Sequence, residues 1–134
     1  MILFVRPHLT WFMPVRVLIA DDAEVIRTAI RGLLACEPTV EVCGEAVNFS
    51  QTLYLAATLQ PDVILLDLHM PDGDTFESPF VKLRLLSIGS RILAMSLWQD
   101  EATKIIAQGY GAVELLDKGK LFNELIPAIR RVSR

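Results

Sequence analysis

The sequence predicts one α/β domain built on a doubly wound sheet of five parallel strands, with helices on both faces. Short apolar runs alternate five times with segments of helical periodicity, and short connections join them. Such alternation favours parallel strands linked by right-handed crossovers. Residues 63–66 are four consecutive aliphatic residues, as in a strand buried on both faces. The 134 residues have the length of one domain and suffice for a core.

In the first half of the chain, we expect strands at 15–20, 40–45 and 63–66, a helix directly after Asp22 and a second helix at about 50–60. The first helix shows apolar residues at i, i+3, i+4, i+7 and i+8 from Ile26 to Leu34. Pro38 and Pro61 mark the ends of the two helices. The third strand gives way to a loop directly after Asp67.

In the second half, a helix is expected to begin near Ser78, since serine is a good N-cap and Pro79 is tolerated in the first turn. Strands follow at 91–96 and 113–117. The helix between them is expected to direct Ala102, Ile105, Ile106 and Gly109 inward. The last helix, from about Lys120, is expected to direct Phe122, Leu125, Ile126 and Ile129 inward.

Residues 1–14 do not resemble the remainder, so we predict an N-terminal extension or arm at 1–14, or a later true start, and one domain at 15–134. No apolar run approaches the roughly 18 residues of a membrane span, and no secretory cleavage site of small residues is present. Cys36 and Cys43 follow no metal spacing and are expected to be reduced packing residues, which favours a cytoplasmic location. The net charge of -3 gives no general attraction to nucleic acid.

Polar residues end four of the five expected strands: Asp21 and Asp22, Asp67, Ser96, and Lys118. In a parallel sheet these ends share one edge. Two carboxylates about 4 Å apart repel by about 4 kcal/mol at an effective dielectric of 20, so the acids need counter-charges. Lys118 supplies one, and a hard divalent cation would supply the rest; carboxylates, water and a phosphate oxygen are the ligands that Mg²⁺ prefers. This chemistry is suited to forming an aspartyl phosphate.

Taken singly, each residue also fits a structural role. Asp22 fits a helix N-cap, Asp67 a strand terminator, Ser96 a strand-end hydroxyl and Lys118 a surface lysine. Their occurrence together, at successive strand ends, favours the functional interpretation.

Four motifs resemble the receiver domain of two-component response regulators over about residues 15–134. They are Val17-Leu-Ile-Ala-Asp-Asp22, Asp62-Val-Ile-Leu-Leu-Asp-Leu-His-Met-Pro71, the strand of Ser96, and Leu115-Leu-Asp-Lys118. The first and third motifs are most similar to the family branch that usually carries a C-terminal helix-turn-helix. The resemblance implies a flavodoxin-like fold with strand order 2-1-3-4-5, an order that is general for receivers.

By this resemblance Asp67 is the phosphoacceptor, and Asp21, Asp22, Asp67 and the His69 backbone carbonyl hold Mg²⁺. Ser96 and Lys118 would bind the phosphoryl group. The implied partner is a sensor histidine kinase or a histidine phosphotransfer protein. Phosphorylation would switch the surface formed by the fourth helix, the fifth strand and the fifth helix. This surface would then form a homodimer or bind another partner.

The sequence departs from the family pattern at several positions. Thr75 stands where a glycine is usual, and Leu115 stands where an inward-turning aromatic is usual. After Ser96 the family prefers a small residue, whereas this chain has Leu97 and Trp98. We therefore expect Leu97, Trp98 and His69 to modulate access to the phosphoryl group and to slow both phosphorylation by small donors and hydrolysis.

A second hypothesis is a pseudo-receiver that acts by phosphorylation-independent protein interaction. An aspartate-nucleophile phosphatase is less favoured, because the acids of Asp72-Gly-Asp74 lie after the strand and the chain has no room for a substrate cap. A flavodoxin lacks support, since no Ser/Thr/Gly-rich loop follows the first strand. We therefore expect no enzyme beyond self-phosphorylation and self-dephosphorylation, and no membrane or DNA binding within these residues. A DNA-binding output domain is expected only in a longer chain.

Overall fold

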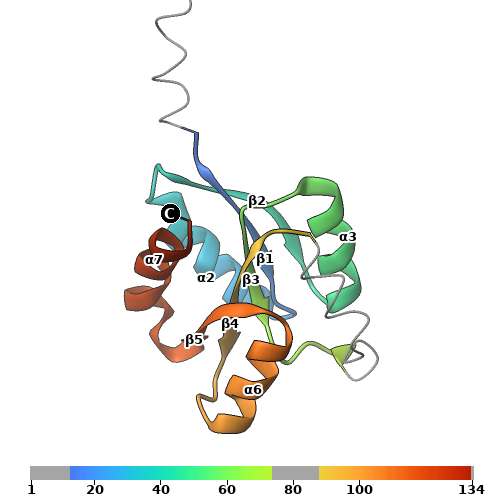
Figure 1. Ribbon diagram of the computed structural model, residues 1–134. Coiled ribbons are helices and arrows are strands. Elements are labelled where there is room, and N and C mark those ends of the chain that lie inside the picture. Colours follow the sequence, from blue (N-terminus) through green and yellow to red (C-terminus); the bar gives the residue numbers. More distant parts are fainter. Residues whose placement is uncertain (1–12, 74–87, 134) are drawn as a thin grey trace, which may run out of the picture.

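The computed structural model describes residues 13–73 and 88–133. It contains five parallel strands in the order β2-β1-β3-β4-β5, which confirms the predicted sheet (Figure 1). The strands are β1 (Val15–Ala20), β2 (Val40–Ala46), β3 (Val63–Asp67), β4 (Arg91–Ser96) and β5 (Ala112–Asp117). The described helices are α2 (Glu24–Ala35), α3 (Phe49–Leu59), α6 (Glu101–Gly109), α7 (Leu121–Val132) and the short 3-10 helix η2 (Lys118–Lys120).

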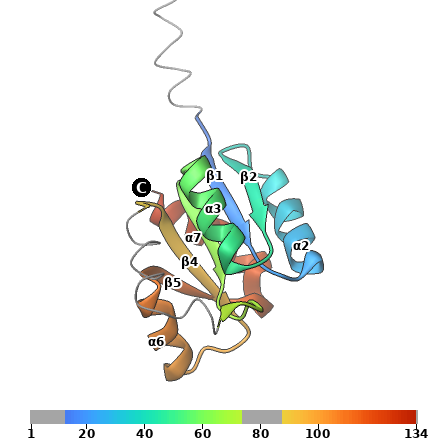
Figure 2. The same ribbon diagram turned by 90° about the vertical axis from the view of Figure 1, so that its right-hand side faces the viewer.

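Helices cover both faces of the sheet, with α2 and α7 on one face and α3 and α6 on the other (Figures 1 and 2). Successive side chains of a strand point to opposite faces, so β3 contributes to two cores. Val63 and Leu65 pack with α2 and α7, whereas Ile64 and Leu66 pack with α3 and α6. All four are fully buried, and each contributes about 1.5–3 kcal/mol to folding. This burial anchors the strand that ends on Asp67.

Polar caps fix where α3 and α6 begin. The Asn48 side chain accepts a hydrogen bond from the backbone N–H of Gln51, and the Asp72 carboxylate accepts bonds from the first N–H groups of α3. Asp100 caps α6 by accepting from the N–H of Thr103. Capping satisfies N–H groups that have no partner within the helix. Asp72 therefore ties the loop after β3 to the start of α3.

In two helices, the residues that are buried differ from those expected from the sequence. In α6, Thr103 and Ala107 are buried, whereas Ile105 is 64% exposed and Ala102 is also exposed. Thr103 tolerates burial because its hydroxyl bonds to Asp100.

In α7, Leu121 is buried and Phe122 is 82% exposed, so the prediction for Phe122 was wrong, although Leu125 and Ile129 are buried as expected. Leu121 and Phe122 lie four and three residues before Leu125. Both spacings fit one helix face, so periodicity alone does not distinguish them.

Some predictions lie outside the described residues: the arm, apart from Met13 and Pro14, the helix near Ser78, and the loop position Thr75. The boundary at residue 15 therefore stays a prediction. Both cysteines are free thiols, but Cys36 is exposed rather than packed. Among the helices that the structure describes, none is long and apolar enough to cross a membrane.

Candidate functional site

The sheet itself assembles the candidate site. Because the strands are parallel, their carboxyl ends lie at one edge, and the register places Asp67 beside Met95 and Ser96 beside Asp117. Asp21 follows β1 directly, and Lys118 follows β5 at the start of η2. Residues separated by up to about a hundred positions in the chain therefore meet at one place.

Three aspartates form the acidic cluster of this edge: Asp21, Asp22 and Asp67. Each offers one carboxylate oxygen, and the three oxygens lie within 4.8 Å of one another. Asp21 and Asp67 are 0% and 1% exposed, whereas Asp22 is exposed. Backbone N–H groups orient the buried pair, since Ala23 donates to Asp21 and His69 donates to Asp67.

Lys118 is the counter-charge of the two buried acids. Its Nζ lies 2.7 Å from Oδ2 of Asp21 and 3.2 Å from Oδ1 of Asp67. Among the described residues, Asp21 Oδ2 has this ion pair and no further hydrogen-bonding partner. One ammonium therefore serves two buried carboxylates.

Burial and charge shift two groups of the site away from their ordinary pKa values. Burial, and then the nearby charge of Asp21, raise the pKa of Asp67, although the His69 N–H and Lys118 act in the opposite direction. Burial by itself would lower the pKa of Lys118. Its contacts with Asp21 and Asp67 outweigh burial, and the pKa of Lys118 is raised. Lys118 is therefore firmly charged, and Asp67 resists ionisation.

The donor set fits a hard divalent cation. Three carboxylate oxygens converge on a place where Lys118 is the counter-charge of the two buried acids, so a divalent cation would supply the positive charge that is still needed. Mg²⁺ takes oxygen ligands and retains several waters, so a site with one exposed acid, Asp22, suits it. The structure thus brings together Asp21, Asp22, Asp67 and Lys118, as the sequence predicted.

Ser96 ends β4 within the same edge and is fully buried. Its Oγ accepts a hydrogen bond from the backbone N–H of Trp98 at 3.0 Å and lies 3.2 Å from Nε2 of His69. The His69 and Trp98 rings meet edge to face, with centroids 5.0 Å apart and planes at 86°. Leu97 and Trp98 are 64% and 57% exposed. His69 and Trp98 therefore contact Ser96, whereas Leu97 lies largely in solvent.

Leu115 is half-buried and packs against the core that α3 and α6 share with the sheet. This is the position at which an aromatic side chain was expected from the resemblance. The aliphatic side chain of Leu115 has no polar group that could interact with the Ser96 hydroxyl.

Two residues that support the site were not identified from the sequence. Arg27 donates to the backbone carbonyl of Asp21 at 2.9 Å and pairs with Glu45 at 3.1 Å. These contacts hold the segment after β1 in place. Gln99 donates to the carbonyls of Ser96 and Leu116 at 3.3 and 3.4 Å. Arg27 falls within an ordinary amphipathic helix and Gln99 within a polar loop, so neither had a distinctive sequence signal.

The comparisons with known proteins give the family. Residues 17–130 match the model of the response regulator receiver domain. The nitrate/nitrite response regulator protein NarL of Escherichia coli K12 is 35% identical over 120 residues, which cover 90% of this chain and 55% of NarL. The chain belongs to the response regulator receiver domain family, and it spans about half the length of this curated relative.

Solved structures agree with this assignment. The signal receiver domain of the putative response regulator NarL from Mycobacterium tuberculosis has a TM-score of 0.78 and 28% identity, covering 90% of this chain and 97% of that chain. The crystal structure of the P1 domain of CheA3 in complex with CheY6 from R. sphaeroides gives 0.74 and 29%, with coverages of 90% and 97%. The flavodoxin-like fold and the resemblance to response regulator receiver domains are thereby confirmed.

Proposed function

We propose that this receiver domain accepts a phosphoryl group on Asp67 in the presence of Mg²⁺. The supporting observation is the position of its carboxylate, at the end of a buried strand, 3.2 Å from Lys118 and among two further carboxylates. A nucleophilic carboxylate needs positive charge beside it, because the incoming group is itself negatively charged; Lys118 supplies one such charge, and the two further carboxylates would hold a metal ion that supplies more. Family membership adds support independent of the geometry.

In the proposed reaction, an oxygen of Asp67 attacks the phosphorus of a phosphohistidine. The P–N bond breaks, and the histidine of the donor takes the released electron pair and a proton. Asp21, Asp22, Asp67 and the His69 backbone carbonyl would hold Mg²⁺, which when bound offsets the charge of the phosphoryl oxygens. Lys118 and Ser96 would bind these oxygens from the protein side.

The proposed donor is a sensor histidine kinase or a histidine phosphotransfer protein. The complex of the P1 domain of CheA3 with CheY6, which includes a chain of similar fold, supports a donor of this kind. The proposed output is a change in the surface of α6, β5 and α7, followed by dimerisation or contact with a partner. A DNA-binding output domain, in a longer chain, and the cytoplasmic location remain predictions.

The alternative is a pseudo-receiver that acts through constitutive protein contacts. Leu115, which brings no ring to the switch position, favours it. The alternative requires no phosphorylation and no role for the pairing of Lys118 with Asp67. The two functions therefore differ in one measurable property, which is covalent modification.

Intact-mass spectrometry after incubation with Mg²⁺ and a phosphodonor tests the proposal. A small donor such as acetyl phosphate is used first, followed by a phosphorylated histidine kinase. One phosphoryl adduct is expected, dependent on Mg²⁺ and absent in Asp67→Asn.

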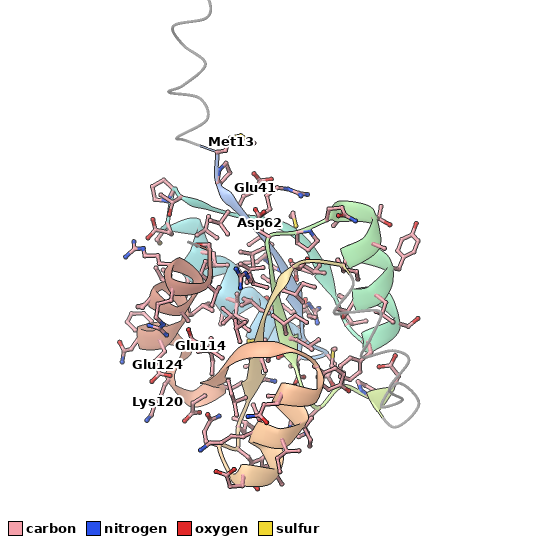
Figure 3. All side chains as sticks on the ribbon, viewed as in Figure 1. Met13, Glu41, Asp62, Glu114, Lys120 and Glu124 are labelled. Atoms are coloured by element: carbon pink, nitrogen blue, oxygen red, sulfur yellow. The ribbon has the colours of Figure 1, made fainter. Side chains whose placement is uncertain are left out.

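Asp62→Asn is the matched control, because Asp62 immediately precedes β3 and lies at the opposite edge of the sheet (Figure 3). This variant should be modified like the wild type. Absence of an adduct in the wild type with either donor would contradict the proposal and favour the pseudo-receiver.

A further inference from the structure

The Ser96 hydroxyl can donate one hydrogen bond. Because Ser96 is fully buried, the acceptor of that bond is expected to be a protein group. Within residues 13–73 and 88–133, its Oγ has two hydrogen-bonding partners, the backbone N–H of Trp98 and Nε2 of His69. A backbone N–H only donates. The hydroxyl hydrogen therefore has a single acceptor among these partners, the lone pair of His69 Nε2. Nε2 can accept this hydrogen only in the ring tautomer that carries its own hydrogen on Nδ1, so the proposal below requires that tautomer.

We propose that His69 is a positioning residue that holds the Ser96 hydroxyl in the unphosphorylated form and competes for it with the phosphoryl group. The inference rests on the proposed function, in which the same hydroxyl donates to a phosphoryl oxygen on Asp67. One hydrogen cannot serve both acceptors at full strength. Loading of Asp67 therefore breaks the contact between His69 and Ser96.

Trp98 connects this exchange to the surface. Its backbone N–H donates to the Ser96 Oγ, and its ring meets the His69 ring edge to face. Movement of either His69 or Ser96 thus alters the surroundings of a tryptophan that is 57% exposed. Leu115 brings no ring to the neighbouring strand, so we assign the aromatic readout of the site to the pair His69 and Trp98.

The competition predicts a measurable change in affinity. Beryllium fluoride binds carboxylates as a phosphoryl mimic and serves as the probe, together with Mg²⁺. His69→Phe keeps a ring against Trp98 but removes the acceptor, so the resting form loses one hydrogen bond that the loaded form does not use. The dissociation constant for beryllium fluoride, measured by calorimetry, should fall about two- to tenfold.

Two further variants separate this effect from the shape of the side chain. His69→Gln retains an acceptor oxygen on a side chain of similar reach and should bind within about twofold of the wild type. In a Ser96→Ala background, His69→Phe should have no effect, because the competition acts through the hydroxyl. A gain that persists in Ser96→Ala would show that His69 merely obstructs the site and would overturn the proposal.

The resting contact is tested first, without any ligand, by the ¹⁵N spectrum of the His69 ring at mildly alkaline pH. The proposal requires a neutral ring with hydrogen on Nδ1 and an acceptor Nε2, whose resonance changes when Mg²⁺ and beryllium fluoride are added. Hydrogen on Nε2 in the resting form would contradict the proposal, whatever the outcome of the phosphorylation experiments.

Fluorescence gives the corresponding readout for Trp98. The Trp11→Phe background leaves Trp98 as the single tryptophan of the chain. Its emission should change on addition of Mg²⁺ and beryllium fluoride, and the change should be lost in Ser96→Ala. An unchanged emission, with binding confirmed by calorimetry, would contradict the role of Trp98. If calorimetry shows no binding to the wild type, the proposed function itself fails, and this inference fails with it.

Discussion

The two edges of the sheet use similar residues in opposite ways. At the amino edge, the Asp62 carboxylate accepts the backbone N–H of Arg16 at 2.8 Å, and the Arg16 guanidinium donates to the carbonyls of Leu59 and Gln60 at 2.6 and 3.1 Å. At the carboxyl edge, the buried carboxylates of Asp21 and Asp67 share the single ammonium of Lys118, at 2.7 and 3.2 Å. In Figure 3, the labels Asp62 and Lys120 mark these two ends of the molecule.

This difference separates stability from function within one sheet. At the amino edge, the Asp62 carboxylate and the Arg16 guanidinium each bond to backbone groups of neighbouring segments. The carboxyl edge concentrates negative charge where burial makes it costly, an arrangement that proteins retain mainly at functional sites. The comparison leads to four predictions about what each residue contributes.

The largest effect is expected for Lys118→Met without Mg²⁺. It leaves Asp21 and Asp67 buried without a counter-charge, and removing one partner of a buried ion pair costs about 3–5 kcal/mol. The free energy of unfolding, from urea denaturation at pH 7, should fall by at least about 3 kcal/mol.

Lys104→Met is the control, since Lys104 is exposed and its Nζ lies 3.6 Å from Glu101 on the surface of α6. Its effect should stay within about 0.5 kcal/mol. Equal effects for the two lysines would remove the distinction between buried and surface pairing.

Mg²⁺ should stabilise the protein by offsetting the charge of the acidic cluster. At ten times its dissociation constant, a ligand that binds only the folded state contributes about 1.4 kcal/mol. Thermal unfolding followed by calorimetry should show this gain in the wild type and its loss in Asp21→Asn. In Asp62→Asn the gain should persist. Stabilisation that survives in Asp21→Asn would place the ion elsewhere.

Asp67→Asn should stabilise the metal-free protein at pH 7, because it removes a carboxylate whose charged form is disfavoured by burial. The pKa of Asp67 is raised by burial, so the folded state binds its proton more tightly than the unfolded state does. Stability then falls as pH rises from the ordinary value of 3.8 through the raised folded pKa.

The variant lacks this decline, and urea denaturation between acidic and neutral pH should show the difference. Asp62→Asn, at the satisfied edge, should not be stabilised. A wild type whose stability rises relative to Asp67→Asn over this pH range would contradict the direction of the pKa shift.

The smallest effect concerns access to the site. Leu97→Ala should speed both phosphorylation by a small donor and hydrolysis by about threefold, equivalent to about 0.7 kcal/mol in each barrier. The effect is modest because Leu97 is largely exposed. Rates are followed by intact mass over time, with Val25→Ala, an exposed position of α2, as the control. Unchanged rates would exclude a steric role for Leu97.

The sequence was informative where local pattern and topology coincide. Strand β3 and its terminal Asp67 were predictable, because an unbroken aliphatic run must be buried and parallel strands must end together. Periodicity did not distinguish Leu121 from Phe122. The contact of His69 with Ser96 joins the loop after β3 to the end of β4, 27 residues along the chain, and no local pattern encodes such a contact. Nor did the sequence decide that Asp21 is buried and Asp22 exposed, since neighbouring residues share the same composition signal.

The most direct test of the central claim is to locate the phosphoryl group. An acyl phosphate is reduced by borohydride to an alcohol, so a phosphorylated aspartate becomes homoserine, which peptide mapping by mass spectrometry identifies. After treatment with Mg²⁺ and a phosphodonor, we expect homoserine at position 67 and unmodified aspartate at positions 21, 22 and 62. Homoserine at position 21 or 22, or at none of these positions, would contradict the assignment of Asp67 as the phosphoacceptor.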